Sequence, residues 1–182
     1  AASMATGSEM DGALTVCDIS GYRLERMAPR MQRAGTDKIR TQVVAALDDP
    51  WISGNAETMD RVLADVPCTG TGAWRRDPNA KWRFTPDDLD DLLALQQGIL
   101  GMARILVKPG GRLIYATCSL LQEENERQLA WFLENHVDFQ ALPIDEVWSE
   151  TVGGPPPVGP CLRLSPASTG TDGFFCAVME RR

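Results

Sequence analysis

Short apolar runs alternate along the chain with longer segments in which apolar residues recur at helical spacing. The apolar runs predict strands at residues 12–18, 39–44, 61–65, 112–116, 139–144 and 173–179. The longer segments predict helices at residues 21–34, 86–106 and 123–135. Gly- and Pro-bearing stretches at residues 48–58, 66–85 and 149–160 are expected to be loops. This alternation predicts parallel β-α-β units and an open α/β sheet covered by helices on both faces.

The segment 86–106 carries the clearest helix signals. Thr85 is a good N-cap, Pro86 suits the first helical position, and the two aspartates that follow favour the positive start of a helix. One face is almost wholly apolar, with Gln96 among its leucines. The run Lys108-Pro109-Gly110-Gly111 is expected to end this helix.

Residues able to do chemistry follow three of the predicted strands. Asp18 ends the first strand, Asp65 ends the third with Cys68 just beyond it, and Cys118 follows the fourth. Ligands of open parallel sheets bind beyond the carboxyl ends of the strands. We therefore expect these side chains to meet at one rim of the sheet.

The cysteines do not form a structural framework. There are five of them, an odd number, and no two stand at a C-x-x-C spacing. A disulfide framework or a zinc site is therefore not expected. Cys17, Cys161 and Cys176 are interpreted as structural residues.

Length and charge set the remaining bounds. The 182 residues fit one domain, with 43% hydrophobic and 24% charged residues. No run of about 18 apolar residues and no opening signal segment is present, so we expect a cytoplasmic protein without a membrane span. The net charge of -7 argues against nucleic-acid binding, unless basic residues gather locally. The acids concentrate at residues 87–91 and 123–126.

The loop of residues 65–72, DVPCTGTG, is the most unusual segment in the chain. Pro67 stiffens the turn, while Gly70 and Gly72 allow a close approach of the backbone to a ligand. With Cys118 past the next strand, Cys68 suggests covalent chemistry on an electrophilic carbon. The alternative is that both are small buried residues.

The pair DVPCTGTG and ATCS, about fifty residues apart, resembles motifs IV and VI of the Sun/RsmB family of RNA cytosine-5 methyltransferases. The RDPNAKWR run at residues 76–83, QQGIL at 96–100 and EENE at 123–126 are similar to further family motifs. The segment 163–175, which contains GTDGFF, is similar to the family's C-terminal strand motif. The resemblance runs from about Gly12 to the end of the chain.

The resemblance implies a Rossmann-like class I methyltransferase sheet with an antiparallel last strand. It implies that the Cys118 thiolate adds to carbon 6 of a cytosine and that carbon 5 takes a methyl group from S-adenosylmethionine. Cys68 would assist release, and Asp65 would hydrogen-bond the cytosine ring. Asp18 would bind the cofactor's ribose, with Asp65 and Pro67 also at the cofactor. The alternative for Asp18 is a helix-capping role, and Asp48 and Asp49 are candidates for adenine contact.

The predicted RNA contacts are basic and aromatic residues beside the Cys68 loop: Arg75, Arg76, Lys81, Trp82 and Arg83. The alternative is a solvated loop that happens to be basic. The expected partner is ribosomal RNA, with transfer RNA as another possibility. We expect a monomer that needs no metal ion.

The family's glycine-rich motif I does not occur in the sequence and would precede Ala1. The first, central strand and the loop under the cofactor's methionine would then be missing, so residues 1–182 are interpreted as a partial catalytic domain. Two other functions stay open. One is methylation of another target, such as DNA cytosine, although those enzymes carry their nucleophile in the Pro-Cys loop. The other is an RNA-binding module that keeps the methyltransferase fold and is inactive because the cofactor loop is absent.

Overall fold

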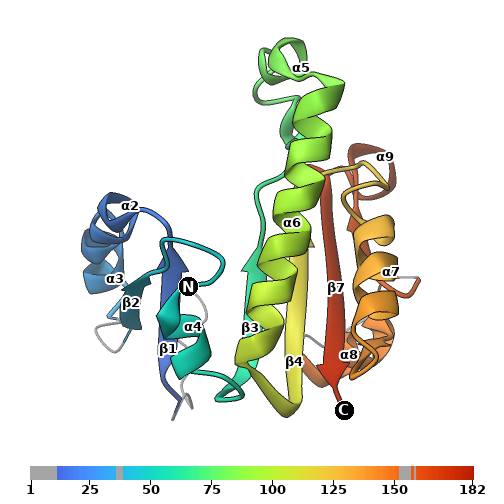
Figure 1. The fold of residues 1–182 in the computed structure, drawn as a ribbon. Helices are drawn as coiled ribbons and strands as arrows, with labels where there is room; N and C mark the ends of the chain where they lie inside the picture. The colour runs from blue at the N-terminus through green and yellow to red at the C-terminus, as the bar shows by residue number, and fades with distance from the viewer. Residues whose placement is uncertain (1–11, 36–38, 152–156, 158) are drawn as a thin grey trace. The chain divides into compact units, whose positions relative to one another are not determined.

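The computed structural model describes residues 12–35, 39–151, 157 and 159–182, and the chain forms two compact units (Figure 1). The first unit ends at Trp51 and the second begins at Ile52. Each unit holds its own β-sheet. The strands that the sequence predicts as one open sheet therefore form two sheets among the described residues.

The first unit contains a parallel β-α-β arrangement, as predicted. Its elements are β1 (Leu14–Asp18), α2 (Gly21–Glu25), α3 (Ala28–Arg33) and β2 (Ile39–Val43). β1 and β2 pair in parallel over their whole length. The residues that close β1 and open α2 therefore lie at the carboxyl end of a parallel strand, where this class of fold binds ligands.

The prediction of a single helix at residues 21–34 is wrong, because the structure has two short helices there. Pro29 lies in the first turn of α3. Proline has no backbone N–H to donate to the carbonyl four residues earlier, which belongs to Glu25. The first helix therefore ends at Glu25 and a new one begins at Ala28.

The predicted loop at residues 48–58 also needs correction, because it contains the helix α4 (Pro50–Gly54). Asp49 Oδ1 accepts a hydrogen bond from the Trp51 N–H at 3.0 Å, and proline suits the first position of a helix. A helix of five residues is too short to show an apolar period. In the sequence, α4 is therefore indicated only by the residues at its start.

The second unit is built on a mixed five-stranded sheet. Its strands are β3 (Met59–Asp65), β4 (Val107–Thr117), β5 (Phe139–Leu142), β6 (Leu162–Leu164) and β7 (Phe174–Arg181). β4 is parallel to β3 and antiparallel to β7, and both β5 and β6 run antiparallel to β7. The strand order is β3-β4-β7-β5. The antiparallel last strand is confirmed, and β6 was not predicted.

The helix α6 (Pro86–Leu106) connects β3 to β4 and confirms the predicted start. Thr85 Oγ1 accepts from the Asp88 N–H, and the Asp88 carboxylate accepts from the Thr85 N–H at 2.8 Å. This reciprocal capping box satisfies two backbone donors that a helix start otherwise leaves unpaired.

The end of α6 differs from the prediction. Lys108 to Gly111 were expected to form a stop, but β4 already begins at Val107 and includes them. The pairing partners of Met59 and Arg61 are Val107 and Arg112, so the residues between these two bulge out of the ladder. Gly110 supplies the positive φ of 73° that this bulge contains.

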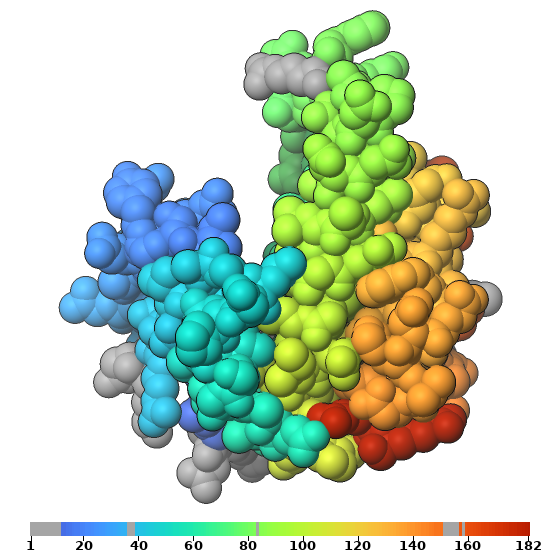
Figure 2. Space-filling view, in the orientation of Figure 1, coloured from blue at the N-terminus to red at the C-terminus, as the bar shows by residue number. Residues whose placement is uncertain are grey.

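The core of the second unit lies between the sheet and two helices, α6 and α7 (Glu126–Asn135). The two helices contact each other, and Figure 2 shows their side chains packed side by side. The largest fully buried apolar side chains come from both helices and from β4 and β7: Leu100, Val107, Leu113, Tyr115, Phe132, Phe175 and Met179. α7 begins later than predicted, because residues 123–125 form turns before it.

Four short elements complete the described fold: η1 (Thr71–Ala73), α5 (Ala80–Arg83), α8 (Ile144–Thr151) and α9 (Pro166–Thr169). The first two fall inside the predicted loop 66–85, and the start of α8 ends the predicted strand 139–144 early. Residues 152–156 and 158 of the predicted loop 149–160 lie outside the described residues. Within the described part of the chain, no helix is both long and apolar enough to cross a membrane.

Candidate active site

The register of β3 and β4 places two chain segments side by side at the carboxyl edge of the sheet. Asp65 pairs with Ala116, and the Val66 N–H donates to the Ala116 carbonyl at 3.2 Å. Both strands therefore end at the same level, and the loops that leave them meet. Cys68 and Cys118 come together there, with their sulfur atoms 3.3 Å apart.

The two thiols differ in environment. Cys118 is exposed, while Cys68 is partly buried. The hydrogen bond from Cys68 lowers the pKa of Cys118 to about 7, against the opposing effects of partial burial and of the negative charge of Asp65. The pKa of Cys68 is raised, because its proton is shared with the Cys118 sulfur and because its side chain is desolvated. When the pair loses one proton, these shifts favour the thiolate on the accessible sulfur and the remaining proton on the enclosed one.

This assignment predicts the pH dependence of Cys118 alkylation. Only the thiolate reacts with iodoacetamide, so the rate should rise about ten-fold per pH unit well below pH 7 and level off above it. Cys68→Ala removes the S–H donor and should move the midpoint to higher pH. Mass spectrometry of the peptide that contains Cys118 measures the rate. A midpoint unchanged by the substitution would contradict the shared proton.

The other predicted residues of this edge lie around the pair. Asp65 and Pro67 are exposed, and the Pro67 carbonyl accepts from Gln96 Nε2 at 3.0 Å. The negative charge of Asp65 raises the pKa of Cys118, so its carboxylate lies near that sulfur. The structure thus gathers Asp65, Pro67, Cys68 and Cys118 at one edge, as the sequence predicts. Asp18, which was expected at the same rim, ends a strand of the other sheet instead.

The glycines of the Cys68 loop serve the protein's own packing. Gly70 has a positive φ of 66°. The Gly72 N–H donates to the Cys118 carbonyl at 3.0 Å, and the Gly173 N–H donates to the Gly72 carbonyl at 2.9 Å. A Cβ at Gly72 would lie 2.5 Å from the Gly173 carbonyl oxygen. From the sequence, the backbone at Gly72 was expected to approach a ligand closely. In the structure it approaches Gly173, in the segment before β7.

Gly72→Ala should therefore destabilise the protein by more than about 2 kcal/mol, because backbone atoms rather than a flexible side chain block the new methyl group. Gly101→Ala is the matched control. Nothing lies within 4 Å of a Cβ at Gly101, in the interior of α6, so this change should stabilise by about 0.5–1 kcal/mol. Urea unfolding followed by circular dichroism measures the change in the free energy of unfolding of each variant. If both substitutions changed this free energy in the same direction, the packing argument would be contradicted.

A buried polar layer lies behind the cysteines and was missed by the sequence interpretation. Its members are all less than 4% exposed: Gln96, Thr117, Ser119, Glu124 and Asn125. Gln128 is equally buried, but its side chain donates to the Leu93 carbonyl at 3.2 Å. Glu124, one of the acids concentrated at residues 123–126, has an exposed fraction of 0%. The available signal was Gln96, a polar residue on an otherwise apolar helix face.

Four of the five predicted RNA contacts have exposed side chains in the segment that follows the Cys68 loop. Arg75 and Arg76 are each about 70% exposed and both pair with Asp172. Trp82 is 81% exposed, and Lys81 Nζ lies 5.4 Å from its ring centroid. The side chain of Arg83 lies outside the described residues. Contact with RNA stays a prediction, but cationic and aromatic groups are accessible there.

The predicted cofactor residues of the first unit lie around the end of β1. Asp18 Oδ1 accepts from the Ser20 N–H at 2.8 Å, and its carboxylate lies 3.5 Å from Arg23. Asp18 thus supports the start of α2, which was the alternative to ribose binding. Both carboxylate oxygens of Asp49 already accept backbone N–H groups, each at 3.0 Å. Ribose and adenine contacts stay predictions.

Comparisons with known proteins agree on one family. The family described as 16S rRNA methyltransferase RsmB/F matches residues 2–180. Ribosomal RNA small subunit methyltransferase B of Sodalis glossinidius is 39% identical over 165 residues, which cover 89% of this chain and 35% of that protein. The same protein of Xanthomonas campestris is 36% identical over 168 residues, 91% of this chain and 37% of that protein.

Solved structures share the fold. The structure of PH0851 is 34% identical with a TM-score of 0.81, covering 93% of this chain and 37% of that one. NSun6 from Pyrococcus horikoshii, solved with the S-adenosylmethionine analogue SFG, is 23% identical with a TM-score of 0.76 and covers 93% and 41% of the two chains. The chain spans a little over a third of the length of the curated relatives it matches.

Proposed function

Because this chain belongs to the RsmB/F family of 16S rRNA methyltransferases, we propose that it methylates carbon 5 of a cytosine in ribosomal RNA. The observation that carries the proposal is the pair of sulfur atoms 3.3 Å apart at the ends of two parallel strands. One thiol is exposed with a pKa lowered to about 7 by the hydrogen bond from the other. This arrangement suits a nucleophile with a proton-holding partner.

The chemistry divides between the two cysteines. Carbon 5 of cytosine is a poor nucleophile until a thiolate adds to carbon 6, and the exposed Cys118 would form that carbon–sulfur bond. Asp65 would hydrogen-bond the ring near its nitrogen and stabilise the adduct. After methylation, the carbon 5 proton passes to solvent water, and Cys68 would assist by relaying it. The electron pair of the broken carbon–hydrogen bond re-forms the ring double bond, the carbon–sulfur bond breaks, and the thiolate returns to Cys118.

S-adenosylmethionine, when bound, would supply the methyl group. The donor set of this chain fits such a cofactor in part. Asp18 stands at the carboxyl end of β1, where an acid can bind ribose hydroxyls, and its Oδ1 accepts from the Ser20 N–H at 2.8 Å. Asp65 and Pro67 are both exposed at the end of β3. We propose these three residues as cofactor contacts.

The target base must reach Cys118 from outside. A cytosine stacked in a helix is out of reach, so it would be single-stranded or flipped out. The exposed surface of Arg75, Arg76, Lys81 and Trp82 would hold the flanking RNA. We propose Arg83 as a further contact.

The test uses ribosomal RNA that contains 5-azacytidine, which traps the carbon 6 adduct, and the full-length product of the gene. Mass spectrometry should find the crosslink on Cys118, and nucleoside analysis of ordinary ribosomal RNA should find 5-methylcytosine. A crosslink on Cys68 would overturn the division of roles. RNA binding without methyl transfer would favour the non-catalytic module instead.

A further inference from the structure

The loop that carries Cys68 is anchored on both sides of the cysteine. On one side, Gln96 Nε2 donates to the Pro67 carbonyl at 3.0 Å. On the other side, the Thr69 N–H donates to Glu124 Oε1 at 2.8 Å and the Thr69 hydroxyl donates to Glu124 Oε2 at 2.6 Å. Gln96 Nε2 also donates to Glu124 Oε1 at 3.0 Å, so both anchors converge on one carboxylate.

The segment that carries Cys118 is anchored in the same way by Asn125, the residue that follows Glu124 in the chain. Asn125 Oδ1 accepts from the Thr117 hydroxyl at 2.6 Å, and Asn125 Nδ2 donates to the Ser119 carbonyl at 3.0 Å. The Ser119 N–H in turn donates to Thr117 Oγ1 at 3.2 Å. The residues before and after Cys118 are therefore held by one amide side chain.

Glu124 and Asn125 are consecutive, and their exposed fractions are 0% and 3%. The Glu124 carbonyl accepts from the hydroxyl of the fully buried Tyr115 at 2.6 Å, which fixes the backbone of the pair against β4. A buried carboxylate costs folding free energy unless its hydrogen bonds are satisfied. Here three donors satisfy it, and two of them belong to the residue that follows Cys68.

We propose that Glu124 and Asn125 are positioning residues that hold the two catalytic thiols against each other, with Glu124 setting the place of Cys68 and Asn125 that of Cys118. The proposal rests on the proposed function. Among the described hydrogen bonds, the side chains of Glu124 and Asn125 reach the residues that flank the cysteines and not the sulfur atoms. Each therefore acts through the neighbours of one cysteine. A displacement of about 1 Å in a reacting group can cost about 10²-fold in rate, so such anchoring has a measurable effect.

The two residues should fail in different ways. Glu124→Ala frees Cys68, so elimination should slow about 10²-fold and a covalent protein–RNA adduct should accumulate on ordinary RNA, as in Cys68→Ala. Asn125→Ala frees Cys118, so turnover should fall about 10²-fold without any adduct. Glu124→Gln keeps an acceptor for the Thr69 N–H and can donate to the Thr69 hydroxyl. It should restore turnover to within about ten-fold of the unmodified protein.

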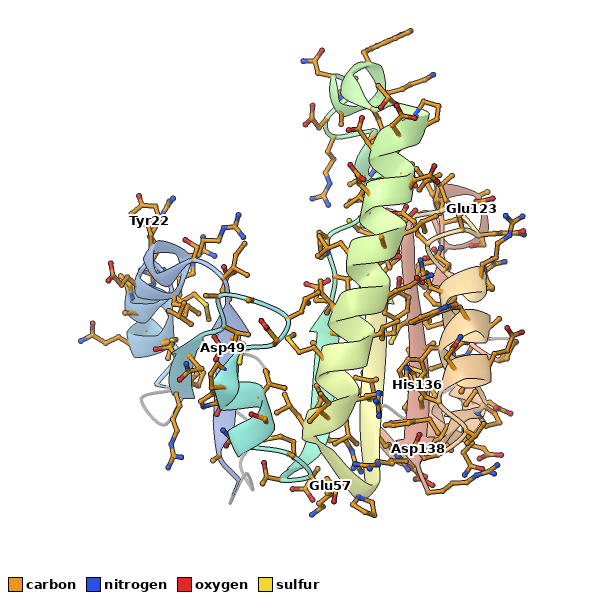
Figure 3. All side chains as sticks on the ribbon, viewed as in Figure 1. Tyr22, Asp49, Glu57, Glu123, His136 and Asp138 are labelled. Carbon is orange, nitrogen blue, oxygen red and sulfur yellow. The ribbon has the colours of Figure 1, made fainter. Side chains whose placement is uncertain are left out.

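The experiment runs these variants in the full-length product of the gene, with ribosomal RNA, and scores adducts on denaturing gels beside 5-methylcytosine. Glu123→Ala is the matched control, because Glu123 pairs with Arg127 outside this layer and should behave as the unmodified protein (Figure 3). Thermal unfolding is recorded for each variant. An adduct cannot form on a collapsed site, so its accumulation in Glu124→Ala separates positioning from general damage.

Two results would overturn the proposal. One is loss of both adduct and turnover in Glu124→Ala while Cys68→Ala accumulates adduct. The other is an unchanged pH midpoint of Cys118 alkylation in Asn125→Ala, since loosening the sulfur contact should raise it. Glu124→Ala does not serve here, because the negative charge of Glu124 itself raises the Cys118 pKa and its loss would offset the rise. If Cys68→Ala itself accumulates no adduct, the proposed release step fails. The alkylation midpoint, which needs no RNA, then still decides the positioning proposal.

Discussion

Cys118→Ala is expected to abolish methyl transfer, with the rate falling by at least about 10³-fold. Without the thiolate there is no addition to carbon 6, and carbon 5 stays too weak a nucleophile to take a methyl group. The rate is measured as 5-methylcytosine formed in ribosomal RNA by the full-length protein. Because Cys118 is exposed, its replacement should leave the unfolding temperature nearly unchanged.

Cys17→Ala is the control for this loss. Cys17 is also an exposed thiol, but it lies on β1 in the first unit and has no place in the proposed chemistry. Its replacement should leave methyl transfer intact. Methylation that survives in Cys118→Ala, with the control behaving as expected, would mean that Cys118 is not the nucleophile.

Cys68→Ala is expected to stop the reaction one step later. The Cys118 adduct and methyl transfer should still occur, but elimination should slow by about 10²- to 10³-fold because the proton-holding partner is gone. The protein should then remain attached to ordinary RNA. A gel shift that resists denaturant and disappears on nuclease digestion measures this.

The combined variant sharpens the order of events. In a protein with both Cys118→Ala and Cys68→Ala, no adduct should form, because the first bond depends on Cys118 alone. An adduct in the double variant would place the covalent link on another residue. Free methylated RNA from Cys68→Ala at an unchanged rate would remove Cys68 from the mechanism.

Much of the fold could be predicted because the relevant signals are local. Thr85 and Pro86 announce α6, and its capping box forms as expected. The errors arise where tertiary contacts override local patterns. Lys108 to Gly111 look like a helix stop but lie within β4, because the strand carries a bulge there. Apolar spacing alone predicts one continuous helix at residues 21–34, but Pro29 lies in the first turn of a second helix.

The site shows the same limit. Strand ends and the resemblance placed Cys68 and Cys118 at one edge, and the parallel register of β3 and β4 explains why they meet. Nothing local indicates that Glu124 is buried, since an acid ahead of a helix is usually a surface residue favoured by the helix dipole. Its burial depends on partners up to 55 residues away, which one sequence does not reveal.

The contact between the two sulfur atoms also has a consequence for oxidation. A peroxide that converts the Cys118 thiolate to a sulfenic acid leaves it beside the Cys68 thiol, and condensation of the two with loss of water closes a disulfide. One bond then consumes both groups that the proposed reaction needs, and a thiol reductant returns them. The activity of a sample handled in air should therefore depend on its history, and recover when dithiothreitol is added.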